Sequence, residues 1–286
     1  MSRSLGAFVA RFVFAVAFVA LCAFAPPASA QQRIGVVLLH GKLGVAMGIA
    51  NGRGDAYGGR LIAALRNAGY LVAAPEMCWS RQRNFDKTYP DCIAEVDNAI
   101  AQLKAQGAMA IVVGGLSLGG NGAIAYGATH TGIIGIIAFG PADDPTRKSQ
   151  RPEFATSLAR ARQLIAQGQG DTKTTFDDVN TNTGDRFAMT VTTTPRIYLS
   201  FNDADALTRL APNLSKLTVP ILWIAGDGDP TQASASTLFG MVPANPQNRF
   251  VTVHSNHIGT PDAGADAAIA WLAQLKKILS RDRNRA

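Results

Sequence analysis

Runs of strand length that are mostly apolar alternate with helix-like segments from Gln32 onward, and this alternation restricts the possible folds more than any other feature. The expected strands span 34–39, 70–74, 110–113, 133–139, 221–225 and 249–253, and the expected helices span about 55–68, 90–106, 118–129, 231–240 and 263–279. Strands and helices that alternate at this spacing form a parallel sheet covered on both faces. We therefore predict an α/β fold with a mostly parallel central sheet of about six strands.

One segment, at about 141–219, interrupts the alternation. It contains one expected helix at about 153–168, a polar run over 168–182 and a second apolar patch over 187–201. An insertion between two sheet strands lies outside the core, and long loops at such places are usually binding loops or lids. We therefore predict a single domain over residues 31–286 that carries a cap at about 141–219.

Residues 1–30 have the layout of a secretory signal peptide. Arg3 and Arg11 accompany an apolar run over 12–24, and Ala28-Ser29-Ala30 offers a cleavage site. A retained membrane anchor is the alternative, but the apolar run is shorter than the roughly 20 residues that span a bilayer. We expect cleavage after Ala30, no stable membrane anchor afterwards, and a periplasmic or secreted protein.

Removal of the leader leaves two cysteines, Cys78 and Cys92. In an oxidising compartment an isolated pair predicts a disulfide. The stretch between them is polar and irregular, and could not keep its shape by burial alone. Two free buried thiols are the alternative reading. No histidines or further cysteines stand at metal-ligand spacing, so we expect no metal site.

The net charge of +7 does not indicate a nucleic-acid partner. The most basic stretch is the C-terminal tail over 276–285, where cations suit the end of a helix, and no basic patch is interleaved with aromatic residues. The glycine-rich stretch 51–54 lacks the ending of a phosphate-binding loop. We expect no cofactor, and the sequence leaves the oligomeric state open.

The pentad Gly115-Leu116-Ser117-Leu118-Gly119 follows one expected strand and opens a helix. Alone the pattern is weak, but this context places Ser117 on a tight turn between strand and helix. The flanking glycines allow strand and helix to approach closely. The free N–H groups of a helix N-terminus favour negative charge, as an acyl-transferring serine requires. Ser117 is therefore the candidate nucleophile.

A serine nucleophile needs a base, and the base needs an acid that orients it. Asp229 follows the fifth expected strand and His257 follows the sixth. Loops at the carboxyl ends of parallel strands lie at the same edge of a sheet as Ser117. We therefore predict a Ser117–His257–Asp229 triad.

Several neighbours remain as alternatives. Asp227 stands where the fifth strand ends, and Asp143 or Asp144 would serve if the acid followed the preceding strand. His254 is the alternative base.

The turn that begins at His40-Gly41 follows the first expected strand. A glycine-containing turn there lets backbone N–H groups face an oxyanion, and the donors we expect are those of Lys42 and Leu118. We interpret His40 as a structural residue that braces this loop.

These motifs together resemble the α/β-hydrolase superfamily, and the overall pattern is similar to bacterial exported hydrolases of the esterase/lipase-like group. The resemblance covers nearly the whole chain after residue 30, although two early strands of larger members are absent. It implies an α/β-hydrolase fold and hydrolysis through an acyl-enzyme: Ser117 attacks, His257 takes and returns the proton, and Asp229 holds the imidazole.

The superfamily does not determine the substrate. We expect a small-molecule carboxylic ester, because only 7% of residues are aromatic and no long exposed apolar helix suggests a lipase that acts at an oil interface. An acyltransferase or a peptidase with the same triad is the alternative, as is a non-catalytic binding module. Four large side chains could line an acyl pocket, although ordinary packing explains them equally well: Trp79, Met189, Tyr198 and Phe201.

Overall fold

The computed structural model describes residues 33–49, 57–179 and 188–283. The segment predicted to be a signal peptide, residues 1–30, lies outside the described residues. Among the helices that are described, none combines the length and the apolar character needed to cross a membrane.

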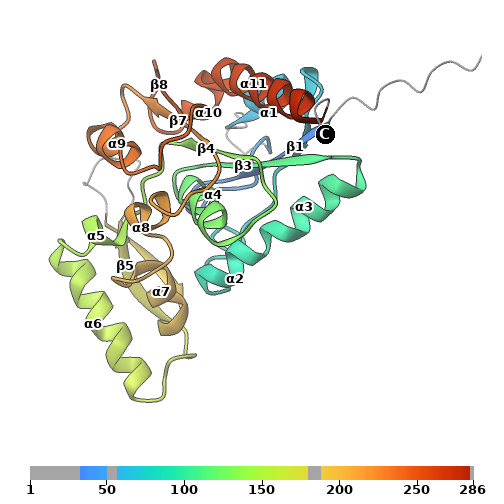
Figure 1. Ribbon diagram of the computed structural model, residues 1–286. Coiled ribbons are helices and arrows are strands. Elements are labelled where there is room, and N and C mark those ends of the chain that lie inside the picture. The colour runs from blue at the N-terminus through green and yellow to red at the C-terminus, as the bar shows by residue number, and fades with distance from the viewer. Residues whose placement is uncertain (1–32, 50–56, 180–187, 284–286) are drawn as a thin grey trace, which may run out of the picture. The chain divides into compact units, whose positions relative to one another are not determined.

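A six-stranded sheet of the order β2-β1-β3-β4-β7-β8 forms the centre of the fold, and every neighbouring pair in it is parallel (Figure 1). Its strands are β1 Ile34–Leu39, β2 Leu71–Ala73, β3 Ala110–Leu116, β4 Gly135–Phe139, β7 Ile221–Gly226 and β8 Arg249–Val253. The four inner strands are buried along their whole length, as continuous apolar runs predict for a sheet covered on both faces. The predicted α/β class and parallel sheet are confirmed.

Helices cover the two faces of the sheet and create two apolar cores. The helices α1 Gly59–Asn67 and α11 Ala265–Arg283 pack on one face, where their side chains meet Val36 and Leu38 of β1. The helices α2 Tyr89–Ala94, α3 Val96–Ala105 and α4 Leu118–Thr129 pack on the other, where they meet Val37 and Leu39. Successive residues of a strand point to opposite faces, so β1 supplies both cores in alternation.

Two short helices lie near the carboxyl edge of the sheet. These are α9 Gln232–Phe239, which follows β7, and α10 Thr260–Ala263, which precedes α11. The helix expected over about 90–106 is divided into α2 and α3 at Glu95.

Between β4 and β7 the chain forms a separate group of elements, which we call the cap segment (residues 141–219). It contains α5 Pro145–Lys148, α6 Pro152–Ala166, β5 Thr174–Val179, β6 Ala188–Thr193, α7 Pro195–Asn202 and α8 Leu210–Leu214. Helix α6 packs on α7 and β5 (Figure 1). The rings of Phe176 and Tyr198 stack with their centroids 4.4 Å apart, and they belong to the same apolar core as α2, α3 and α4.

The antiparallel hairpin β5–β6 was not expected from the sequence, which reads as a polar run over 168–182. The hairpin is stabilised by side chains of mixed character: Phe176, Asp178 and Val179 are all buried. A buried aspartate at an inward position conceals the apolar alternation by which a strand is normally recognised.

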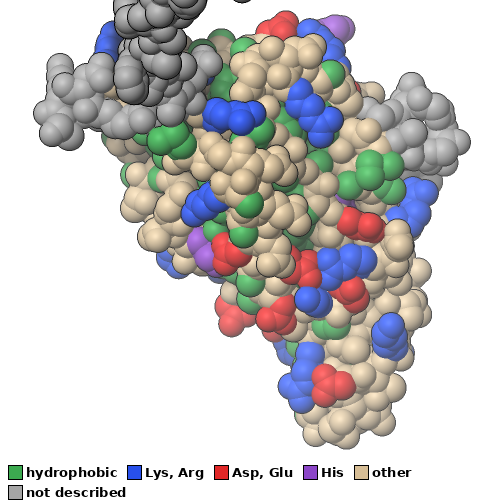
Figure 2. All heavy atoms as spheres, turned by 90° about the vertical axis from the view of Figure 1, so that its right-hand side faces the viewer, with side chains coloured by type: hydrophobic (Ala, Val, Ile, Leu, Met, Phe, Trp, Pro, Cys, Tyr) green, Lys and Arg blue, Asp and Glu red, His purple; other side chains and the backbone are tan. Residues whose placement is uncertain are grey.

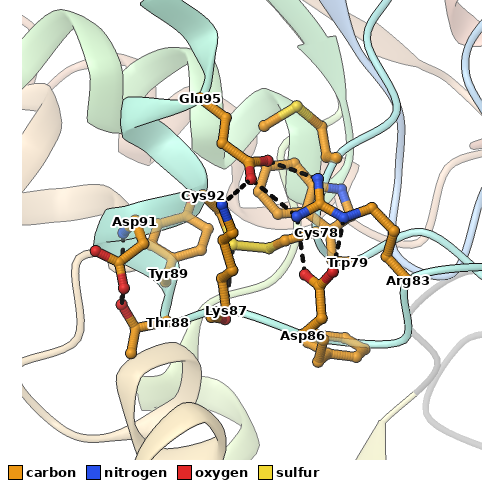
Figure 3. The surroundings of a disulfide bond; sticks show 12 residues. Cys78, Trp79, Arg83, Asp86, Lys87, Thr88, Tyr89, Asp91, Cys92 and Glu95 are labelled. Atoms are coloured by element: carbon orange, nitrogen blue, oxygen red, sulfur yellow. Dashed lines mark hydrogen bonds and ion pairs between the residues drawn. A yellow bond between two sulfur atoms is a disulfide. The ribbon is translucent and has the colours of Figure 1, made fainter.

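The predicted disulfide is present and joins Cys78 to Cys92 (Figure 3). The loop that it closes also carries a surface ion-pair network, in which Arg83 contacts both Asp86 and Glu95. On the face shown in Figure 2, acidic and basic side chains are interspersed, and they do not gather into one broad patch of a single sign.

Candidate active site

Ser117 occupies the turn between β3 and α4 with φ 57° and ψ −121°. A non-glycine residue with such dihedrals stores roughly 1–3 kcal/mol of strain, and it persists only where its surroundings determine it. Here the Ser117 N–H donates to the carbonyl oxygen of Phe139 at 3.0 Å, and the Ser117 carbonyl accepts from the N–H of Asn121 at 3.0 Å. The strained turn is therefore held by a backbone hydrogen bond on each side.

The glycines on either side of Ser117 are required by close backbone packing. A Cβ on Gly119 would collide with the carbonyl oxygens of Leu39 and His40 at the end of β1. A Cβ on Gly115 would collide with the carbonyl group of Gly119. Strand β3, helix α4 and the end of β1 thus meet at a point where no side chain fits.

His257 and Asp229 form a buried pair. The Nδ1 atom of His257 lies 2.7 Å from Oδ2 of Asp229, and the two side chains are 2% and 0% exposed. The other carboxylate oxygen accepts from both the N–H and the hydroxyl of Thr231, each at 2.8 Å. Burial raises the pKa of Asp229, but the hydrogen bond from His257 leads the interactions that outweigh it, and the pKa lies below its ordinary value.

An ionised Asp229 accepts a hydrogen bond from Nδ1–H and so leaves Nε2 of His257 as an acceptor. This Nε2 atom is buried and has no hydrogen-bond partner among the described residues. A serine hydrolase's base accepts a hydrogen bond from the serine hydroxyl, and this structure forms no such bond between Ser117 and Nε2 of His257.

The three predicted residues meet around the end of β4. Ser117 is hydrogen-bonded to Phe139, the last residue of that strand. A Cβ on the next residue, Gly140, would lie 2.6 Å from Oδ2 of Asp229 and 3.4 Å from Nδ1 of His257. The backbone of Ser117 and the Asp229–His257 pair thus lie on either side of the Phe139–Gly140 junction at the carboxyl edge of the sheet, with no hydrogen bond between Ser117 and His257.

The alternative residues are occupied elsewhere. His254 and Asp227 form a second pair at 2.8 Å, but their side chains are 99% and 48% exposed. Asp144 caps α5 through a hydrogen bond from the N–H of Thr146 at 2.8 Å.

The loop over residues 40–44, which we call the oxyanion loop after its proposed role, lies directly against Ser117. A Cβ on Gly41 would lie 3.4 Å from Cβ of Ser117. Among the residues that the structure describes, the N–H groups of Lys42 and Leu118 donate no backbone hydrogen bond. The prediction that both groups serve as oxyanion donors stays a prediction.

His40 braces this loop. Its Nε2 atom accepts a hydrogen bond from the N–H of Met77 at 2.9 Å, and its Nδ1 atom lies 2.8 Å from the carbonyl oxygen of Gly41. The two contacts require a neutral ring with the proton on Nδ1. Burial lowers the pKa of His40, which favours the same neutral form.

A buried cluster of four charges borders the oxyanion loop, and sequence analysis missed it. The Lys42 ammonium contacts Asp143 at 2.7 Å and Asp178 at 2.8 Å, and the Lys148 ammonium contacts the same two carboxylates at 2.6 and 3.3 Å. None of the four side chains is more than 10% exposed. Asp143 meets both lysines in ion pairs and not in well-aligned hydrogen bonds. We call these residues the charged cluster.

Within this cluster, the charged forms of Lys42 and Asp143 are stabilised by their neighbours. Burial lowers the pKa of Lys42, but the carboxylates of Asp143 and Asp178 outweigh burial and raise the pKa above its ordinary value. Burial raises the pKa of Asp143, but Lys148 and Lys42 outweigh it and lower the pKa. The only sign of the cluster in the sequence was Asp178. It follows Phe176 by two positions, so in a strand the two side chains point to the same side.

A gap too narrow for a water molecule lies between the charged cluster and Leu118. Of the four side chains proposed from sequence as an acyl pocket, only Phe201 borders this space. Trp79 and Tyr198 are fully buried in aromatic packing, and Met189 is half-buried on β6. Within the described part of the chain, no group of three or more histidine, cysteine or carboxylate side chains is arranged to hold a metal ion.

The parallel sheet, the strained serine turn and the buried histidine–aspartate pair at its carboxyl edge define an α/β-hydrolase fold. The family model described as serine aminopeptidase, S33, matches residues 54–254. The chain therefore belongs to this family of α/β serine hydrolases. No curated protein matches the chain in sequence.

Solved structures of similar fold include several lipolytic enzymes. The monoacylglycerol lipase of Paleococcus ferrophilus is 19% identical, with a TM-score of 0.60 over 84% of this chain and 94% of that one. A structure from the metagenome-derived lipolytic enzymes LipS and LipT is 18% identical, with a TM-score of 0.58 over 86% and 95%. The thermostable carboxyl esterase of Bacillus coagulans is 18% identical, with a TM-score of 0.56 over 86% and 91%. At these identities the likeness establishes the fold.

Proposed function

We propose that this protein hydrolyses small carboxylic esters through an acyl-enzyme on Ser117. The observation that carries the proposal is the buried His257–Asp229 pair, whose unpartnered Nε2 atom lies at the same edge of the sheet as the strained Ser117 turn. A positioned base, an orienting acid and a serine on such a turn are the parts that nucleophilic acyl transfer needs.

In the proposed reaction, Nε2 of His257 accepts the proton of the Ser117 hydroxyl while Oγ attacks the ester carbonyl carbon. The negative charge moves to the carbonyl oxygen, which faces the N–H groups of Lys42 and Leu118. When this intermediate collapses, the C–O bond to the alcohol breaks and the alcohol leaves with the proton from His257. Water then attacks the acyl-enzyme by the same route, gives its proton to His257, and releases the acid and free Ser117.

The charges beside the site favour an ester over an N-terminal peptide. An aminopeptidase must bind the free ammonium group of its substrate, which requires a carboxylate that has no other partner. The buried carboxylates that border the oxyanion loop, Asp143 and Asp178, are both paired with lysines. The proteins of similar fold include lipases and esterases and also a proline iminopeptidase, so the fold alone does not separate the two functions.

Peptide hydrolysis is the second candidate, because the description of the matching family names a serine aminopeptidase. The two functions share the same nucleophile and differ in the leaving group. They are separated by comparing p-nitrophenyl acetate and butyrate with a series of aminoacyl p-nitroanilides as substrates for the purified protein.

The test of the nucleophile is labelling by a fluorophosphonate probe, followed by mass spectrometry of the modified peptide. We expect one adduct, on Ser117, and no labelling or ester hydrolysis in Ser117→Ala. Ser255→Ala is the matched control, because Ser255 lies in the exposed surface loop that precedes His257, and it should label as the unaltered protein does. A folded protein that neither labels nor hydrolyses any ester would refute the proposal.

We also propose that the protein acts outside the cytoplasm. The Cys78–Cys92 disulfide supports this, because structural disulfides persist in oxidising compartments. N-terminal sequencing of protein recovered from the periplasm or medium should begin at Gln31.

A further inference from the structure

The two oxygen atoms of the buried Asp229 carboxylate have different partners. Oδ2 lies 2.7 Å from Nδ1 of His257. Oδ1 accepts two hydrogen bonds from a single residue, Thr231: one from its N–H and one from its hydroxyl, each at 2.8 Å. An ionised carboxylate only accepts hydrogen bonds, so the Thr231 hydroxyl is the donor. Within the described part of the chain, Thr231 thus supplies both donors to the oxygen that His257 does not contact.

The Thr231 hydroxyl does not serve the helix that begins beside it. Thr231 directly precedes α9, and a threonine at this position usually accepts a hydrogen bond from a backbone N–H in the first turn of the helix. Here the side chain makes no such bond. The N–H of Gln232, the first helical residue, donates to the backbone carbonyl of Asp229 at 3.0 Å. The hydroxyl is therefore used on the carboxylate and not on the helix.

A second donor on Oδ1 restrains the orientation of the Asp229 carboxylate. The terminal torsion of an aspartate has broad minima, so a carboxylate with fewer hydrogen bonds turns more easily. With the hydroxyl removed, a buried negative charge would also lose one of its three donors. Both changes weaken the contact between Oδ2 and Nδ1. That contact keeps the proton of His257 on Nδ1 and leaves Nε2 as an acceptor.

We propose that Thr231 is a positioning residue, whose hydroxyl holds the Asp229 carboxylate so that Oδ2 faces Nδ1 of His257. The inference rests on the proposed function, because the orientation of His257 affects turnover only if His257 is the base that serves Ser117. Thr231 itself does not touch the reacting atoms. It acts on them through the acid and the base.

A different role for Thr231 would be packing alone. The residue is 6% exposed, so its methyl group also fills space beside the site. Two substitutions separate these roles. Thr231→Val keeps the branched shape and removes the hydroxyl, whereas Thr231→Ser keeps the hydroxyl and removes the methyl group. If the hydroxyl is what matters, the serine variant retains the function and the valine variant loses it.

The experiment measures kcat and KM for p-nitrophenyl butyrate in purified full-length variants, and records the proton NMR signal of the His257 Nδ1–H. A proton between an imidazole and a carboxylate resonates far downfield, and its absence from His257→Ala assigns it. For Thr231→Val we expect kcat to fall about 5- to 20-fold, KM to change less than about threefold, and the downfield signal to shift or broaden. Thr231→Ser should keep the signal and lose less than about threefold in kcat.

Thr193→Val is the matched control. Thr193 is 1% exposed, and its hydroxyl donates to the carbonyl oxygen of Phe85 at 2.7 Å. The same substitution therefore removes a buried threonine hydroxyl that has no contact with Asp229 or His257. Its kcat and downfield signal should equal those of the unaltered protein. If Thr231→Val does not fold, Thr231→Ala also lacks the hydroxyl and should show the same losses.

Three results would overturn the inference: full kcat in a folded Thr231→Val, an unchanged downfield signal in that variant, or a Thr231→Ser as slow as Thr231→Val. Each leaves the proposed function intact, because the unaltered protein still turns over esters. Absence of labelling and hydrolysis in the unaltered protein is a different result, which removes the proposed function and this inference with it.

Discussion

The Nδ1 atom of His257 lies 2.7 Å from Oδ2 of Asp229, and the pair is buried. Its sequence neighbours His254 and Asp227 form a pair of nearly the same length, 2.8 Å, at the surface. Water and salt screen an exposed pair, while a buried one keeps its strength and its orientation. The difference between the two pairs is therefore burial and not distance.

Substitutions of the two histidines should therefore differ in their effect on activity. We expect His257→Ala to lower kcat/KM for p-nitrophenyl butyrate on the order of 10⁴-fold, since loss of one triad member removes nearly all of the triad's contribution. His254→Ala should stay within about twofold of the unaltered protein. Steady-state kinetics with circular dichroism as a check of folding decides this. Equal losses in the two variants would contradict the assignment.

Gly119→Ala should destabilise the fold. Its Cβ would collide with two backbone carbonyl oxygens, which cannot move aside as a flexible side chain can. Overpacking of this kind costs about 1–3 kcal/mol, and backbone collisions lie at the upper end. Urea unfolding measures the loss. Gly240→Ala is the control, because Gly240 has helical dihedrals and a Cβ there meets only ordinary contacts at 3.4 Å or more. It should be neutral or slightly stabilising.

Acid should destabilise the protein through Asp143. Lys148 and Lys42 outweigh the effect of burial and lower the pKa of this carboxyl to about 2. A carboxyl whose pKa is lower in the folded state stabilises the fold at pH values above its unfolded pKa of about 4. That stabilisation, about 2 kcal/mol, is lost as the pH falls from about 4 to 2.

The measurement is the free energy of unfolding in urea between pH 6 and pH 2. Asp143→Asn is less stable at neutral pH, because two buried lysines then share one carboxylate. Its stability should, however, fall less steeply over the acid range than that of the unaltered protein. Parallel curves for the two proteins would show that Asp143 does not titrate as described.

Removal of the disulfide should lower stability. The two cysteines are 14 positions apart, and closing a loop of this length stabilises a fold by about 3 kcal/mol. We expect Cys78→Ala/Cys92→Ala to unfold at a correspondingly lower urea concentration. A reductant should shift the unaltered protein in the same direction and leave the double variant unchanged. A reductant effect of equal size on both would point to another cause.

The features that could be predicted from the sequence are those that depend on residues close together in the chain. The run Ile34–Leu39 has no polar residue, as a strand buried on both faces requires, and Ser117 stands between strand and helix. The order of serine, aspartate and histidine then follows from the order of the strands. The choice between Asp229 and Asp227 depends on burial, which a loop sequence does not encode.

The charged cluster lay beyond such patterns. Lys42 and Asp178 are 136 positions apart, and no spacing rule connects them. Charged side chains are seldom buried unless they are paired. Without knowledge of its partner, each of these residues would therefore be assigned to the surface. Strand β5 was also missed because Asp178, a charged residue, occupies a buried position where a strand usually carries an apolar residue. One buried ion pair thus accounts for both the unexpected hairpin and the unexpected chemistry.

Trp79, the residue after Cys78, accepts a hydrogen bond from Leu43 and donates one from Nε1 to the carbonyl oxygen of His40, both at 2.9 Å. The backbone of Arg81 adds a third bond, to Gly44 at 3.0 Å. The disulfide loop therefore supports the oxyanion loop through three hydrogen bonds. Protein produced in a reducing host would lack the disulfide that closes this supporting loop, so we expect the oxyanion loop to be held less firmly beside Ser117.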